Sequence, residues 1–175
     1  MKKLPILALV LFLFSCQKSI ETANDSLPKF DQAAEEKAIM KVIENETSCF
    51  FKGDYECWTK SWSHQPYAMQ AWNNDNGTFD AAVGWDKINS QGKGWIEKYY
   101  KNGENVIHPK FKRDTIQFKF FNEKTAYLIW RQVNADAKGP KAQVSQETRI
   151  MEKEADGWKI VNVTAIWDSK NKITY

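Results

Sequence analysis

The sequence predicts an α+β domain in which N-terminal helices pack on one face of a curved antiparallel sheet. In the first half of the chain, hydrophobic residues recur every three or four positions, as in amphipathic helices. From about residue 112 they alternate with polar residues instead, in segments rich in β-branched and aromatic side chains. Helices followed by antiparallel strands are typical of the α+β class.

Three helices are expected. The first covers residues 31–52, because its apolar side chains share one face. Asp54 can cap a short second helix that presents Trp58 and Trp62 on its apolar side. A third helix is expected from Trp85 to about Lys101.

A hairpin is expected between the second and third helices, and four longer strands after the third. The hairpin joins residues 67–72 to residues 78–81 through a turn rich in Asn, Asp and Gly. Turn residues separate the longer strands, which are expected over residues 112–121, 125–134, 143–154 and 158–167. The roughly 145 residues from position 31 onward suit one domain with one core.

The N-terminus has the features of a bacterial lipoprotein signal. Lys2 and Lys3 precede an apolar run over residues 4–14, which is shorter than the ~20 residues that a membrane-spanning helix needs. The run ends at Leu13-Phe14-Ser15-Cys16, which resembles the lipobox of bacterial lipoproteins, with Phe14 bulkier than usual. A plain secretory signal is the alternative.

This interpretation divides the chain into three parts. Residues 1–15 are expected to be the signal peptide, residues 16–30 a flexible tether that starts at the lipidated Cys16, and residues 31–175 the folded domain. The expected location is the cell envelope, with the lipid in the membrane, most simply the outer membrane facing the periplasm.

Charge and cysteine content narrow the function classes. Without Lys2 and Lys3, 23 of the 25 basic residues remain against 22 acidic ones, so the electrostatic footprint of a nucleic-acid binder is missing. Cys49 and Cys57 are either a disulfide or two buried thiols. We expect no metal and no cofactor, since the two histidines have no Cys or His partner nearby.

Several segments resemble the nuclear transport factor two-like superfamily, including its SnoaL-like members. Residues 39–60, which end in Lys-Gly-Asp-Tyr-Glu-Cys-Trp-Thr-Lys, resemble its first two helices, and residues 83–88 the start of its third. Residues 146–150 and 156–161 resemble its last hairpin. The nearest resemblance is to the association domain of calcium/calmodulin-dependent protein kinase two. It implies a cone-shaped sheet around a deep pocket, and often a dimer formed through the outer sheet face.

Strand pairing predicts which side chains line that pocket. A loop centred on Gly139 places Arg131 opposite Glu147 and Ile129 opposite Arg149, and directly opposed residues share a face. A turn at Asp156-Gly157 then places Thr164 opposite Arg149. The predicted pocket face consists of Tyr127, Ile129, Arg131, Glu147, Arg149, Asn162 and Thr164. The resemblance likewise implies that Arg149 points into the cone.

Three functions follow from this lining. The first is binding of a small, anionic ligand around Arg149, since a guanidinium fork suits a carboxylate; the Arg131–Glu147 pair is more simply a cross-strand ion pair. The second is a hydratase or isomerase that uses His64, Tyr127 or Glu147, although clear catalytic machinery is missing. The third is an assembly module with a vestigial pocket.

Tryptophan is unusually frequent, with eight residues in the chain. By the predicted alternation, Trp130, Val161, Val163 and Trp167 lie on the outer sheet face, which would be too apolar to leave in water. This predicts a homodimer; a sugar-stacking platform is the alternative.

Overall fold

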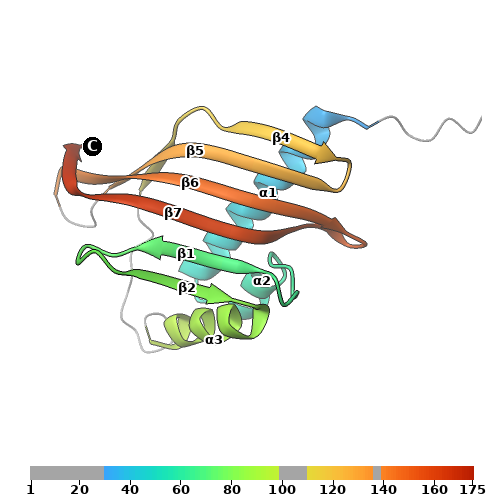
Figure 1. The fold of residues 1–175 in the computed structure, drawn as a ribbon, viewed down its shortest axis with the longest axis horizontal. Coiled ribbons are helices and arrows are strands. Elements are labelled where there is room, and N and C mark those ends of the chain that lie inside the picture. Colours follow the sequence, from blue (N-terminus) through green and yellow to red (C-terminus); the bar gives the residue numbers. More distant parts are fainter. Residues whose placement is uncertain (1–29, 99–109, 136–138) are drawn as a thin grey trace, which may run out of the picture.

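The structure is a computed structural model that describes residues 30–98, 110–135 and 139–175. Within these residues it has three helices and a seven-stranded sheet (Figure 1). The expected signal peptide, Cys16 and the tether up to residue 29 lie outside the described part, as does the expected end of the third helix near Lys101. Phe30, the last residue of the expected tether, packs edge-to-face on Phe120 with ring centroids 5.2 Å apart.

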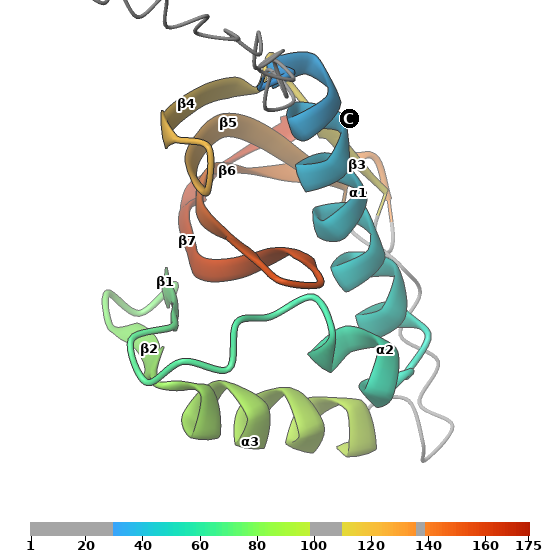
Figure 2. The same ribbon diagram turned by 90° about the vertical axis from the view of Figure 1, so that its right-hand side faces the viewer.

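The helices lie on the concave side of the sheet. α1 (Gln32–Phe51) begins at Asp31, whose side chain accepts a hydrogen bond from Ala34 N, and it crosses the concave face (Figure 2). α2 (Tyr55–Thr59) is capped in the same way by Asp54. α3 (Trp85–Ile96) lies beside the β1–β2 hairpin. Among the described residues, no helix is both long and apolar enough to cross a membrane.

The sheet is mixed but mostly antiparallel, with the order β2-β1-β7-β6-β5-β3, and β4 also pairs with β5. Only β1 and β7 run parallel among these pairs. The strands are β1 (Met69–Asn73), β2 (Phe79–Val83), β3 (Phe111–Arg113), β4 (Gln117–Asn122), β5 (Thr125–Ala135), β6 (Lys141–Glu154) and β7 (Gly157–Thr174).

The single strand expected over residues 112–121 is wrong, because the chain forms two strands there. Arg113 pairs with Gln132, and Gln117 pairs with Ile129. The chain thus advances four residues from Arg113 to Gln117 while β5 advances only three between their partners. Such an extra residue is a bulge, which bends the edge of the sheet. Asp114 holds the break in place, since its backbone N donates to Arg131 O and its carboxylate pairs with the Arg131 guanidinium.

Tryptophans form much of the core between the helices and the sheet. Trp58 is 2% exposed and lies over Gly92 of α3 so closely that a Cβ atom on Gly92 would overlap the indole ring. Trp130 is also 2% exposed and belongs to the same core cluster. The outward position predicted for Trp130 is therefore wrong.

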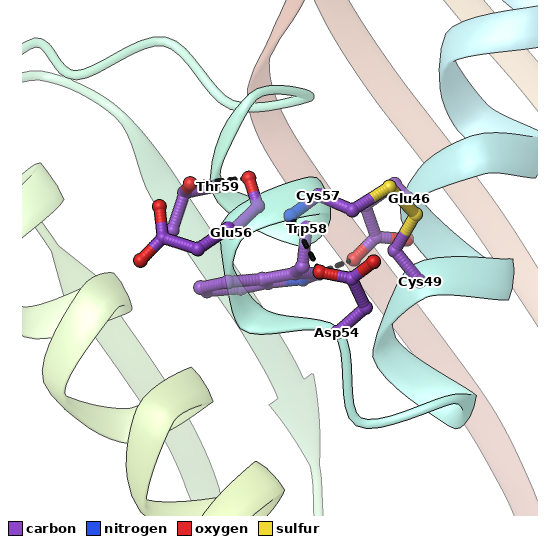
Figure 3. Close-up of a disulfide and its surroundings, with 7 residues drawn as sticks. All are labelled: Glu46, Cys49, Asp54, Glu56, Cys57, Trp58 and Thr59. Atoms are coloured by element: carbon purple, nitrogen blue, oxygen red, sulfur yellow. Dashed lines mark hydrogen bonds between the residues drawn. A yellow bond between two sulfur atoms is a disulfide. The ribbon is translucent and has the colours of Figure 1, made fainter.

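A disulfide joins Cys49 near the end of α1 to Cys57 in α2, with Cα atoms 5.6 Å apart (Figure 3). Of the two alternatives that the sequence left open, the structure has the disulfide. The bond holds the short second helix against the last turns of α1, where Glu46 and Trp58 also meet.

The predicted register between β5 and β6 is wrong by one residue. Arg149 pairs with Leu128, and Glu147 with Trp130, while Arg131 pairs with Gln146. The prediction centred the connecting loop on Gly139, and a loop centred on a single residue contains an odd number of residues. In the structure the loop between the paired Ala135 and Ala142 holds an even number.

The predicted register between β6 and β7 is also wrong by one residue. The hairpin closes with Glu154 opposite Gly157, one residue earlier than expected, and the register shifts between Met151–Ile160 and Ile150–Asn162. Arg149 therefore pairs with Val163 instead of Thr164. Because side chains alternate along a strand, a one-residue shift moves each predicted partner to the opposite face of the sheet.

Candidate ligand-binding pocket

A cavity of about 460 Å³ opens between the concave face of the sheet and the last turns of α1 and α3. β1, β3, β5, β6 and β7 supply its floor. Its lining residues are Thr47, Phe51, Trp72, Trp95, Phe111, Arg113, Gln132, Asn134, Glu147, Arg149, Val163, Ala165 and Trp167.

Two arginines project into the cavity from separate strands. Arg113 comes from β3 and Arg149 from β6, and their side chains are 12% and 13% exposed. Both contact the ring of Trp130, with Cζ 5.6 Å and 5.0 Å from its centroid. This cation–π contact holds the two positive charges over the same aromatic surface.

Glu147 anchors Arg149. Nη1 of Arg149 donates to Oε2 of Glu147 at 3.1 Å and to the backbone oxygen of Thr148 at 2.8 Å. Oε1 of Glu147 accepts from the Ser145 hydroxyl at 2.6 Å. Both oxygens of the buried Glu147 carboxylate thus have hydrogen-bond partners. Of the Arg149 guanidinium nitrogens, only Nη1 donates a hydrogen bond within the described residues.

A chain of amides continues from Ser145 to Arg113. The Ser145 oxygen accepts from Nδ2 of Asn134, whose Oδ1 accepts from Nε2 of Gln132. Oε1 of Gln132 accepts from Nε of Arg113 and from the indole nitrogen of Trp130, both at 3.2 Å. The network fixes which end of each amide faces the cavity.

Several guanidinium donors have no acceptor within the described part of the chain. Nε and Nη2 of Arg149 make no hydrogen bond there. Arg113 uses only Nε, because its Nη1 lies 4.0 Å from the exposed Glu44, beyond hydrogen-bond range. These donors keep accessible surface in the cavity, so a ligand that accepts from both arginines can form charge-assisted hydrogen bonds there.

The lining carries a net positive charge, since its charged residues are Arg113, Arg149 and Glu147. Burial and the neighbouring positive charge of Arg149 lower the pKa of Arg113. The two cations therefore repel each other across the cavity, and an anion between them would relieve this repulsion.

Aromatic side chains form the rest of the wall. Trp72 of β1 and Trp95 of α3 lie with ring centroids 5.3 Å apart, and Trp167 of β7 lines the same cavity. The side chain of Asn73 bonds both the backbone N and O of Trp167, which holds the edges of β1 and β7 together at this end. The cavity thus offers an apolar surface opposite the arginines.

A smaller hollow of about 200 Å³ adjoins the cavity and shares Thr47, Phe51 and Trp95 with it. Glu46 lines this hollow, and its Oε1 accepts from Nε1 of Trp58 at 2.9 Å (Figure 3). Some of the Glu46 surface stays accessible toward the hollow, but protein atoms surround the carboxyl group, and this burial raises its pKa.

The structure brings only two of the predicted pocket residues into the cavity, Glu147 and Arg149. On β5, Arg131 faces the opposite side of the sheet, where it pairs with Asp114 at 3.0 Å. The other predicted pocket residues, Tyr127, Ile129, Asn162 and Thr164, also lie on that convex face. Their placement follows from the two register shifts. The predicted Arg131–Glu147 pair is likewise wrong.

His64 lies outside the cavity. Its ring stacks on Trp85 at 3.9 Å and its Nε2 contacts Thr59 O at 3.0 Å, on an exposed loop. Tyr127 is on the convex face. Of the three residues proposed for an enzyme, only Glu147 lines the cavity.

The sequence prediction missed several cavity residues. Glu46 had a signal, since it follows Val42 by four positions and Ile43 by three and so shares the apolar face of α1. No sequence signal marked Arg113, because the orientation of its side chain depends on the bulge at Asp114. Trp167 and Val163 were expected on the outer face, and the bulge in β7 turns both side chains inward.

Comparison with solved structures finds the same fold at low sequence identity. An NTF-2 like protein of unknown function from Shewanella oneidensis MR-1 matches with a TM-score of 0.53 and 20% identity, over 75% of this chain and 98% of that chain. An NTF2-like protein with a cystatin-like fold from Novosphingobium aromaticivorans matches with a TM-score of 0.57 and 15% identity, over 79% and 85%.

A putative dehydratase of the NTF2-like family from Streptomyces avermitilis matches with a TM-score of 0.57 and 12% identity, over 78% of this chain and 97% of that chain. No protein-family model and no curated protein matches the sequence. The chain therefore has the nuclear transport factor two-like fold, which confirms the predicted α+β class. The fold alone assigns no activity.

Proposed function

We propose that this domain binds a small organic anion with an aromatic or otherwise apolar body. The observation that carries the proposal is the pair of nearly buried guanidiniums, Arg113 and Arg149, whose remaining N–H groups point to no protein acceptor in the described residues. A carboxylate suits such planar donors because it can accept two parallel hydrogen bonds.

The rest of the cavity supports the same ligand class. Its volume of about 460 Å³ lies within the usual range for small-molecule sites, about 300–1,000 Å³. Trp72, Trp95 and Trp167 offer flat apolar surfaces to the body of the ligand. An open cavity whose accessible arginine donors have no protein acceptor among the described residues favours binding over an assembly module with a vestigial pocket.

The experiment compares acids with their neutral amides. Thermal-shift and calorimetric titrations of the protein with phenylacetate and indole-3-acetate should show binding, while phenylacetamide and indole-3-acetamide should bind weakly. Equal affinity for acid and amide would show that the arginines do not select charge, and the proposal would then be wrong.

We also propose that the chain is an exported lipoprotein, anchored through Cys16 in the bacterial cell envelope. The signal over residues 1–15 supports this, and so does the Cys49–Cys57 disulfide, because disulfides persist mainly in oxidising compartments.

Finally, we propose a homodimer through the convex sheet face, the mode of assembly implied by the resemblance to the kinase association domain. Val83, Met69 and Asn162 are directly paired and so share this face. Its exposed apolar side chains include Phe79, Val83 and Ile166, which are 75%, 51% and 61% exposed. The dimer proposal now rests on these three exposed side chains, because Trp130 and Trp167, on which it first rested, face inward.

A further inference from the structure

Glu46 has the hydrogen-bond environment of a carboxyl group that can hold a proton. Its Oε1 accepts from Trp58, while its Oε2 lies 3.3 Å from the hydroxyl of Thr47. That hydroxyl also lies 3.0 Å from the backbone oxygen of Ile43. Thr47 has one hydroxyl proton and can donate to only one of these two acceptors.

The protonated form gives both Glu46 oxygens and the Thr47 hydroxyl a hydrogen-bond partner. Protonated Oε2 donates to the Thr47 oxygen, which donates in turn to Ile43 O. When Glu46 is ionised, its Oε2 competes with Ile43 O for the single Thr47 hydroxyl proton, although Ile43 O also accepts from the backbone N–H of Thr47 within α1. Nε1 of Trp62 is buried without a hydrogen-bond partner among the described residues, and it lowers the pKa of Glu46, against the larger raising effect of burial.

Thr47 connects this cluster with the cavity, because it lines both hollows. The charged groups near Glu46 come from three elements. Arg149 of β6 lowers the pKa of Glu46 by its positive charge, against the larger effect of burial. Arg113 of β3 is also close, and the negative charge of Glu46 raises the pKa of Arg113. Glu147 is paired with Arg149, and Glu44 on α1 is 66% exposed.

We propose that Glu46 takes up a proton when an organic anion occupies the pocket, so that ligand binding is coupled to protonation. The inference rests on the proposed function, because it assigns the anion to the two arginines. An anion there offsets the positive charge that stabilises ionised Glu46. The carboxyl group then gains its proton at a higher pH than in the free protein.

Ligand affinity should therefore decrease as the pH rises. Below the pKa of Glu46 in the free protein, the group is protonated with or without ligand, and affinity is highest. Between the free and bound pKa values, each binding event takes up a proton, and affinity falls by as much as tenfold per pH unit. Above the bound pKa, Glu46 is ionised in both states and affinity levels off at its lowest value.

A probe with permanent charge tests this directly. Naphthalene-2-sulfonate stays anionic across the pH range, so any pH dependence belongs to the protein. Calorimetry of the purified full chain, in buffers of different ionisation enthalpy, should show uptake of up to one proton in the wild type. The uptake should disappear in Glu46→Gln, which keeps an acceptor for Trp58. Binding without proton uptake, or uptake that persists in Glu46→Gln, would overturn the inference.

A second measurement needs no ligand. In a carboxyl-¹³C glutamate NMR titration, Arg149→Gln should raise the pKa of Glu46 further, as a bound anion does, while Lys119→Gln on the convex face should leave it unchanged. An unaltered Glu46 titration in Arg149→Gln overturns the coupling even when the sulfonate binds. If neither the sulfonate nor the carboxylates bind at any pH, the proposed function fails, whatever the NMR titration shows.

Discussion

Arg149 and Glu147 lie two positions apart on β6 and form an ion pair inside the concave face, with Nη1 of Arg149 3.1 Å from Oε2 of Glu147. The pair leaves Nε and Nη2 of Arg149 open to the cavity. The carboxylate thus holds the guanidinium in place, and among the described residues it is also the one negative charge in the lining of the cavity.

Removing the Arg149 charge should weaken anion binding. We expect Arg149→Gln to cost a carboxylate ligand about 1.5–3 kcal/mol, the usual range for hydrogen bonds to charged groups, and calorimetry measures the loss. Lys119→Gln is the control, because it also removes one positive charge but pairs with Tyr127 and so faces outward on the same sheet. Similar losses in the two variants would contradict the assigned pocket.

Removing the Glu147 charge should act in the opposite direction. Glu147→Gln keeps an oxygen to accept from Ser145 or Arg149 but raises the net positive charge of the cavity. We expect carboxylates to bind more tightly, with a smaller effect for neutral amides. Weaker carboxylate binding by a variant that is still folded would show that Glu147 positions Arg149 more than it competes with the anion.

The packing of Trp58 on α3 should be sensitive to one methyl group. Gly92→Ala places its Cβ atom against the Trp58 indole, and overpacking of this kind costs about 1–3 kcal/mol of the free energy of unfolding. Gly94→Ala, in the same helix, meets nothing within 4 Å and should stabilise the helix by up to about 1 kcal/mol. Chemical denaturation of both variants checks the contrast.

The proposed dimer places Ile166 in an interface. Ile166→Glu should yield a monomer in sedimentation analysis, because a buried, unpaired charge is costly. Tyr175→Glu, at an exposed position after β7, should stay dimeric. A wild-type protein that sediments as a monomer at high micromolar concentration would remove the basis for this interface.

The proposed anchor depends on Cys16. Cys16→Ser should abolish labelling by a palmitate analogue and release the protein from the membrane fraction, since each buried methylene of a lipid chain contributes about 0.8 kcal/mol. Cys57→Ser is the control and should stay labelled. Labelling that persists in Cys16→Ser would show that the lipobox interpretation is wrong.

The sequence by itself determined the fold class and most of the elements. Periodicity is a local property, so it located α1 and the strands β5, β6 and β7 to within a few residues at most of their ends, apart from a longer C-terminal extension of β7. Asp31 and Asp54 were readable as helix starts for the same reason, because a cap needs only the next three residues.

Only the tertiary structure decided which side chains meet in the cavity. The face of a strand depends on register, and a bulge or a loop with one residue more or fewer reverses it. The bulge in β7 turned Val163 and Trp167 inward, and the even loop after Ala135 set Arg149 against Leu128. Arg113 entered the site through a third irregularity, at Asp114. Nothing in local composition marks these positions, because their stability comes from contacts between distant segments.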